Sequence, residues 1–279
     1  MSEKLIFLNR SFVPENTASF SVFDRGLLYG DGLFETVRIY GGKFFRLGAH
    51  LRRMFDGAKV LGIKIPYTHD EMEIFTRELA MTNQILDGFA RIVLSRGEGY
   101  LGFSPHGCTT PHVVICARER QVAFRSKETW RLTFHKRAVA PLPLKSLSYL
   151  PHILAKKQAE DDGFDDAIVF DAAGTAIECT GSNLFLWKDG RLITPPLSTG
   201  CLPGITRAEI IKVARKEKIH VVEKKFGAKE CRKADGIFIT NSLMEVVPCH
   251  LGKKINTDIL AQTNELAASF AYYRSEAVL

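Results

Sequence analysis

Stretches with strand character and stretches with helix character alternate in both halves of this 279-residue chain. β-Branched and aromatic residues gather over 32–40, and Gly41-Gly42 then predicts the turn of a hairpin. Apolar residues recur at helical spacing over 47–61 and 70–81, with Thr68-His69-Asp70 as the predicted cap of the second helix. Similar patterns predict strands over 5–8, 20–23, 90–95, 112–117, 130–135, 166–171, 176–178 and 184–187, and helices over 150–161 and 206–216.

A polar, turn-like segment divides these elements into two groups. We therefore predict an N-terminal α/β domain over 1–118, a linker over 119–128, and a C-terminal α/β domain over 129–279. Because strands and helices are mixed in both parts, the predicted class is α+β with two domains.

Composition excludes several classes of function. The formal charge of +7 comes from basic residues scattered along the chain, which does not predict a nucleic-acid-binding surface. No stretch approaches the roughly 20 apolar residues of a membrane span, and the first ten residues lack the features of a signal peptide. The six cysteines stand alone, without a C-x-x-C pair, which predicts reduced thiols in the cytoplasm and no metal site.

The segment 97–102 matches the pattern G-x-G-x-x-G and follows a predicted strand. A dinucleotide site needs a helix to begin at this point, so that its first amides face the pyrophosphate. Pro105 follows instead and opposes a regular helix. We predict a loop over 95–107 and no nicotinamide site.

Three features separated along the chain point to one cofactor chemistry. Lys145 lies in a stiff apolar stretch, as a Schiff-base lysine requires, although most lysines are solvated surface groups. Glu178 is an acid among apolar and small residues, which suits a partner for a pyridine nitrogen but also fits a surface acid at a strand end. The glycine turn at 202–207 precedes a helix and could hold a phosphate or simply cap that helix. The order of these three features along the chain indicates this cofactor chemistry more specifically than any single feature does.

The chain resembles the class IV aminotransferases of fold type IV over residues 5 to 250, nearly its whole length. The resemblance rests on short motifs that occur in the family's order. These motifs lie at 24–26, 29–32, 34–36, 50–54, 145–150, 165–171, 178, 182–185, 194–196 and 202–207.

The resemblance implies a pyridoxal 5′-phosphate enzyme with its cofactor at the interface of the two domains, the second of which would be the cofactor-binding domain. It implies that Lys145 forms the Schiff base, that Glu178 binds the pyridinium nitrogen, and that Tyr149 donates to the phenolic oxygen. Arg137 would be a second partner of Glu178 or a surface arginine. A homodimer acting on small amino acids and keto acids is also implied. The implied phosphate ligands are Arg53, the amides of Ile205 and Thr206, and the Thr240 hydroxyl.

Three activities share these parts, and the sequence separates them only weakly. Thr36 stands where branched-chain aminotransferases usually have Gly, whereas 34–38 and 240–246 resemble 4-amino-4-deoxychorismate lyases. Phe34 replaces the Tyr of familiar D-amino acid enzymes, so the substrate carboxylate would bind elsewhere, at Arg25, Arg96 or Arg38. We favour a D-amino acid transaminase that uses 2-oxoglutarate or pyruvate, with the lyase and then the branched-chain enzyme as alternatives. The predicted substrate-binding residues are Phe34, Arg25, Arg96, Thr36 and Asn241.

Overall fold

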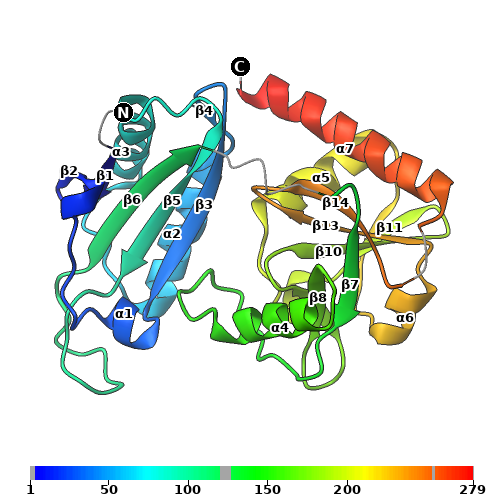
Figure 1. The fold of residues 1–279 in the computed structure, drawn as a ribbon, viewed down its shortest axis with the longest axis horizontal. Coiled ribbons are helices and arrows are strands. Elements are labelled where there is room, and N and C mark those ends of the chain that lie inside the picture. Colours follow the sequence, from blue (N-terminus) through cyan, green and yellow to red (C-terminus); the bar gives the residue numbers. More distant parts are fainter. Residues whose placement is uncertain (1–3, 120–126, 253–254, 279) are drawn as a thin grey trace. The chain divides into compact units, whose positions relative to one another are not determined.

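A computed structural model describes residues 4–119, 127–252 and 255–278 (Figure 1). The chain forms two compact units, and each is described by itself. Of the described residues, the first contains 4–119 and 144–149, and the second contains 127–143, 150–252 and 255–277. Most of the linker predicted over 119–128 lies outside the described residues.

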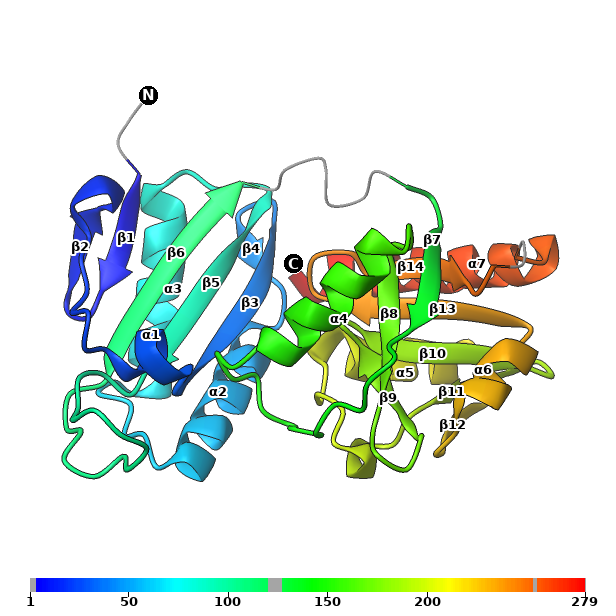
Figure 2. The same ribbon diagram turned by 60° about the horizontal axis from the view of Figure 1, so that its bottom comes forward.

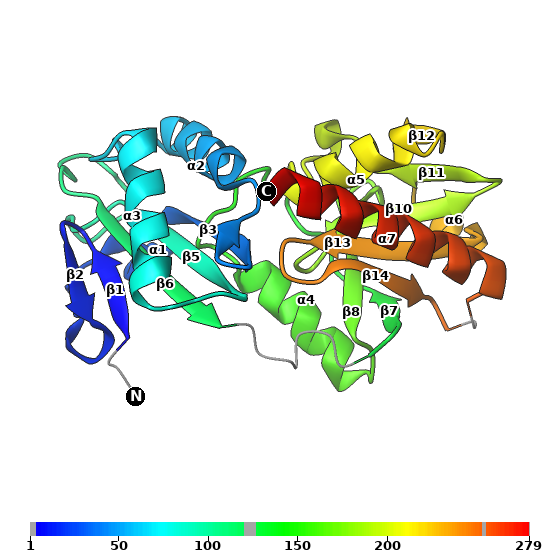
Figure 3. The same cartoon turned by 90° about the horizontal axis from the view of Figure 1, so that it is seen from above.

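The first unit is an antiparallel sheet with two long helices. Its strands follow the order β2-β1-β6-β5-β3-β4, and α2 and α3 pack on one face of the sheet (Figure 3). The opposite face carries Phe34 and Thr36 of β3 and Arg91 of β5, and it belongs to the candidate site. The elements are β1 (Leu5–Leu8), β2 (Ser11–Pro14), η1 (Glu15–Thr17), α1 (Arg25–Tyr29), β3 (Gly32–Tyr40), β4 (Lys43–Phe44), α2 (Leu47–Leu61), α3 (His69–Thr82), β5 (Gly88–Ser95) and β6 (His112–Glu119).

Local sequence accounts for most of these elements. The predicted hairpin is confirmed: Tyr40 pairs with Lys43, and Gly41 and Gly42 adopt φ of 55° and 77°, the left-handed region that glycine enters without strain. Both predicted helices are confirmed, and the Thr68 side chain accepts from the Glu71 amide in a capping box. The loop predicted over 95–107 is confirmed over 96–107, whereas Ser95 is the last residue of β5.

The strand predicted over 20–23 is wrong. This segment forms a turn before α1, and the side chains of Phe20, Val22 and Phe23 are exposed. Its apolar residues resemble those of a strand, but no neighbouring strand pairs with them in the described structure.

The second unit is built on a mixed sheet with the strand order β12-β11-β10-β13-β14-β7-β8-β9 (Figure 2). The Trp187 indole of β10 donates to the Thr263 hydroxyl of α7 at 2.9 Å, which ties the C-terminal helix to the sheet. Its elements are β7 (Trp130–Phe134), α4 (Leu150–Asp161), β8 (Asp166–Phe170), β9 (Ala176–Cys179), β10 (Asn183–Lys188), β11 (Arg191–Thr194), η3 (Leu197–Thr199), α5 (Ile205–Lys216), β12 (Val221–Glu223), α6 (Ala228–Lys233), β13 (Gly236–Asn241), β14 (Glu245–His250) and α7 (Thr257–Val278).

Candidate active site

The lysine segment runs alongside β3 of the first unit. The Phe34 amide donates to the Lys145 carbonyl at 2.8 Å, and the Leu147 amide donates to the Gly32 carbonyl at 2.9 Å. Ser146 forms an antiparallel bridge with Leu33. These main-chain hydrogen bonds place residues 144–149 in the first unit, whereas the predicted boundary placed them in the C-terminal domain.

Aromatic rings surround the amine of Lys145. Its Nζ lies 4.7 Å from the ring centre of Phe34 and 5.7 Å from that of Tyr149. The two rings meet edge to face with centres 5.1 Å apart. A partly buried amine among rings has few water contacts, and this is the environment that a nucleophilic lysine needs.

Arg53 is held by the most deeply buried carboxylate of this site. Glu35 on β3 accepts from Nε and Nη2 of Arg53, both at 2.7 Å, and from Nδ1 of His50 at 2.7 Å. Burial raises the pKa of the Glu35 carboxyl, but the hydrogen bonds and positive charge of its partners outweigh it and bring the pKa to about 2. Burial lowers the pKa of His50, so the neutral ring donates. The two-point contact fixes the plane of the Arg53 guanidinium.

Arg25 and Arg96, two of the predicted carboxylate ligands, are bound to the chain itself. Nε of each donates to Asp31, at 3.0 Å and 2.7 Å respectively. Arg25 also donates to the carbonyls of Tyr100, Gly102 and Phe103, and Arg96 donates to the carbonyl of Leu61. Both guanidiniums are therefore used by the fold, and that of Arg25 holds the 97–103 loop.

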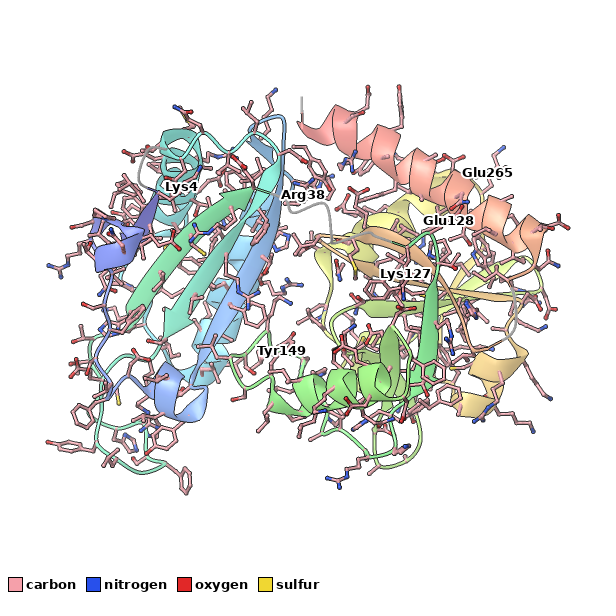
Figure 4. The ribbon with its side chains drawn as sticks, in the orientation of Figure 1. Lys4, Arg38, Lys127, Glu128, Tyr149 and Glu265 are labelled. Carbon is pink, nitrogen blue, oxygen red and sulfur yellow. The ribbon has the colours of Figure 1, made fainter. Side chains whose placement is uncertain are left out.

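Arg38, the third of these arginines, is also used by the fold. It extends from β3 (Figure 4) and donates to the carbonyls of Ile39 and Gly88 and to Asp87. Its side chain is buried and lies over the Tyr40 ring.

Arg91 was missed by the sequence reasoning. Its guanidinium carbon lies 3.7 Å from the ring centre of Phe34, and Nη1 donates to the Thr36 hydroxyl at 2.9 Å. Burial lowers its pKa, but a guanidinium stays charged at neutral pH. The alternation of β5 predicts one face for Arg91, yet only the pairing of β5 with β3 shows that Phe34 shares that face.

Glu178 belongs to the second unit and is held at one oxygen. Its Oε2 accepts from Nδ2 of Asn183 at 3.2 Å and from the Leu202 amide at 3.1 Å. Nε2 of His152 lies 4.0 Å from Oε1. Arg137, for which a place beside Glu178 and a surface position were both predicted as alternatives, is exposed.

The N-terminus of α5 offers amides to an anion. Its N-cap is Gly204, and no described side chain caps the helix. A Cβ at this position would lie 1.9 Å from Oδ1 of Asn183, so this approach requires glycine. The first turn begins with Ile205 and the buried Thr206, both predicted phosphate ligands. Helix N-termini attract phosphates through their amides and dipole.

Thr240 carries a polar atom without a partner among the described residues. Its side chain on β13 is 1% exposed, and its hydroxyl makes no hydrogen bond to that part of the chain. A buried hydroxyl in this state costs about 1–3 kcal/mol, so it fits a residue whose partner is a ligand. The donors of this unit thus fit the phosphate that the resemblance implies.

Asn241, a predicted substrate ligand, braces the turn after β13. Its Oδ1 accepts from the amides of Leu243 and Met244 at 3.0 Å and 2.8 Å, and its Nδ2 donates to Ser182 Oγ at 3.0 Å. The side chain therefore fixes the turn that follows Thr240.

No helix of the described residues is both long and apolar enough for a bilayer span. Nor do these residues contain a group of three or more His, Cys, Asp or Glu side chains arranged to bind a metal ion.

Comparison with known proteins identifies the family. A family model described as amino-transferase class IV matches residues 32–251. The chain is 39% identical to a Methanocaldococcus jannaschii protein provisionally named branched-chain-amino-acid aminotransferase, over 97% of this chain and 96% of the relative. It is 31% identical to D-alanine aminotransferase of Listeria monocytogenes serotype 4b, over 87% of this chain and 86% of that protein.

Solved structures agree with this assignment. The branched-chain aminotransferase of the archaeon Thermoproteus uzoniensis, solved with norvaline, superimposes with a TM-score of 0.86 at 28% identity, covering 96% of this chain and 96% of that one. Another branched-chain amino acid aminotransferase of similar fold was solved with pyridoxamine 5′-phosphate. The chain belongs to the class IV aminotransferases, which are pyridoxal 5′-phosphate enzymes of fold type IV.

Proposed function

We propose that this aminotransferase transfers the amino group of a branched-chain L-amino acid to 2-oxoglutarate. The observation that carries the proposal is the pair of aromatic rings, Phe34 and Tyr149, beside the Lys145 amine. Such rings offer apolar surface to a branched side chain. The nearly full-length similarity to the M. jannaschii protein supports this substrate class over the D-amino acid type that the sequence favoured.

A D-amino acid transaminase is the second candidate. It is supported by the 31% identity to D-alanine aminotransferase of Listeria monocytogenes. Against it, the identity is lower and covers less of the chain than that to the M. jannaschii protein.

Bound pyridoxal phosphate supplies a carbonyl carbon that exchanges amines and a ring that withdraws electrons from the substrate α-carbon. In our proposal Lys145 would hold that carbon, and its Nζ would carry the proton of the substrate α-carbon. Glu178 would accept the N–H of the ring nitrogen; Nδ2 of Asn183 and the Leu202 amide donate to this carboxylate and hold it in place. Tyr149 would donate to the phenolic oxygen of the ring.

Four groups are proposed to hold the cofactor phosphate: Arg53, the amides of Ile205 and Thr206, and the hydroxyl of Thr240. Glu35 fixes the Arg53 guanidinium, which offers a rigid positive charge. The helix dipole of α5 adds a further favourable potential for a dianion.

Replacing Thr240 by Val tests this assignment. Because the hydroxyl has no partner among the described residues, we expect folding to be unaffected and cofactor affinity to fall about 10-fold or more, the loss of a hydrogen bond to a charged group. The dissociation constant is measured by adding pyridoxal phosphate to the apoenzyme. Thr76→Val is the control, since the Thr76 hydroxyl bonds the Met72 carbonyl inside α3. Equal affinity in wild type and Thr240→Val would contradict the assignment.

Arg91 is our candidate for the side-chain carboxylate of 2-oxoglutarate. It contacts the same Phe34 ring as Lys145, and its described side-chain hydrogen bond goes to a hydroxyl, whereas Arg38 donates to main-chain carbonyls. A guanidinium with N–H groups to spare can bind a carboxylate at two points.

The substrate class is tested in three separate assays. The first contains 2-oxoglutarate and L-leucine, the second contains 2-oxoglutarate and D-alanine, and the third contains aminodeoxychorismate. We expect glutamate from L-leucine, with kcat/KM at least about 10-fold above that with D-alanine, because the rings accommodate a larger apolar group. Pyruvate from D-alanine at the higher efficiency would favour the second candidate. Aminobenzoate as the only product would show a lyase and refute both.

The homodimer and the cytoplasmic location stay predictions. The dimer has support from an exposed apolar patch of the first unit, in which Leu27, Tyr100 and Phe103 are 70%, 85% and 91% exposed. Leu27 lies on α1, and Tyr100 and Phe103 lie in the 97–103 loop. Arg25 of α1 donates to main-chain carbonyls of that loop and so holds the two segments together. Patches of this kind mark protein interfaces. A monomeric mass of the holoenzyme in solution would refute the dimer.

A further inference from the structure

We propose that Thr36 is a positioning residue that fixes the Arg91 guanidinium over the ring of Phe34. Arg91, held in this way, binds the second carboxylate of the dicarboxylate substrate in one half of the reaction. The inference rests on the proposed function and names the residue that controls its dicarboxylate half. It also gives Thr36 a different role from the direct substrate contact predicted from the sequence.

The pairing of two strands brings Thr36 and Arg91 together. They are directly opposite each other in the antiparallel ladder of β3 and β5, so their side chains leave the sheet on the same face. The Thr36 hydroxyl accepts from Arg91 Nη1 at 2.9 Å, and the Thr36 side chain is buried. A β-branched side chain has few rotamers, which keeps this acceptor in place.

The ring of Phe34 fixes the guanidinium from a second direction. Its centre lies 3.7 Å from the Arg91 guanidinium carbon, a close cation–π contact. Within the described chain, Thr36 provides the hydrogen bond that this guanidinium makes. Arg25 and Arg38, by contrast, each donate to at least two carbonyl groups. Arg91 is therefore oriented, yet it retains donors for a ligand.

Orientation matters because an arginine side chain loses rotamer freedom when it binds a carboxylate. If Thr36 has already fixed the side chain, less of that entropy is lost on binding. Phe34 also contacts Lys145, so the fixed guanidinium and the reactive amine share one ring. A residue at position 36 without a side-chain acceptor could not hold Arg91 in this way.

The test compares two ligands that cannot react, added to the holoenzyme in a calorimeter. Glutarate carries two carboxylates, and 4-methylvalerate carries one carboxylate and a branched apolar end. We expect Thr36→Val, which keeps the shape but removes the acceptor, to weaken glutarate about 3- to 10-fold and to leave 4-methylvalerate within about 2-fold. Thr36→Ser keeps a hydroxyl and should retain most of the glutarate affinity. Arg91→Leu should weaken glutarate more than it weakens 4-methylvalerate.

The outcomes separate this inference from the function on which it rests. Equal weakening of both ligands by Thr36→Val, or no weakening of either, overturns the role of Thr36. If Arg91→Leu leaves glutarate binding unchanged while the wild type still converts L-leucine, the inference fails and the proposed function stands. If wild type does not convert L-leucine but Thr36→Val still weakens glutarate alone, the substrate assignment fails and the positioning role stands. Melting temperatures of all variants within a few degrees of wild type show that the fold is intact.

Discussion

Replacing Lys145 with alanine is expected to lower the rate of amino transfer by at least about 10³-fold. In our proposal one amine has two tasks, holding the cofactor carbon and carrying the proton of the substrate α-carbon. Proton transfer by a positioned group alone contributes about 10²–10⁴-fold. The rate is measured in single turnovers with L-leucine, and the visible absorbance band of the lysine-bound cofactor should disappear.

Lys157→Ala provides the matched control for this experiment. Lys157 is exposed on α4 and pairs with Asp161 four residues later, an interaction of little consequence for stability. We expect this variant to keep both rate and absorbance band. A Lys145→Ala enzyme that retains the band at full strength would show that another lysine binds the cofactor.

Replacing Glu35 with glutamine is expected to lower the free energy of unfolding by ~3 kcal/mol at pH 7. The buried carboxylate compensates the charge of Arg53 and accepts from His50, and an amide cannot do both. Burial raises the pKa of Glu35, but these two partners outweigh that effect and lower it from 4.5 to about 2. The quantity to measure is the unfolding free energy in denaturant, with and without bound cofactor.

The ion pair of Glu35 with Arg53 makes the free energy of unfolding depend on pH, and the direction of this dependence can be predicted. Because the folded-state pKa of Glu35 lies below its unfolded value, its stabilisation is fully present above pH 4.5 and is lost as the pH falls toward 2. The stability difference between wild type and Glu35→Gln should therefore shrink over this window. Glu73→Gln is the control, since the exposed Glu73–Arg77 pair contributes at most about 1 kcal/mol. A difference that grows as the pH falls would contradict the ionised state of Glu35.

Elements whose hydrogen bonds are local could be predicted from the sequence. The α2 and α3 helices show apolar spacing, α3 begins with a capping box, and the hairpin at Gly41-Gly42 has the turn residues it needs. The strands β2 and β11 to β14 and the helices α1, α6 and α7 were not predicted, and the strand over 20–23 was wrong. Strand formation depends on partners far along the chain, and a short apolar stretch does not show whether such a partner exists.

The family chemistry of this protein could be predicted from its amino-acid sequence, because a lysine, an acid and a glycine turn before a helix are local motifs in a characteristic order. The surroundings of these groups could not be predicted in this way, because they depend on contacts between distant segments. Lys145 lies beside Phe34 because residues 144–149 pair with β3, more than one hundred positions earlier. Likewise Arg91 rather than Arg25 or Arg96 faces Phe34, because strand register sets the face on which a side chain lies. Register depends on long-range hydrogen bonds, and no single segment of sequence encodes them.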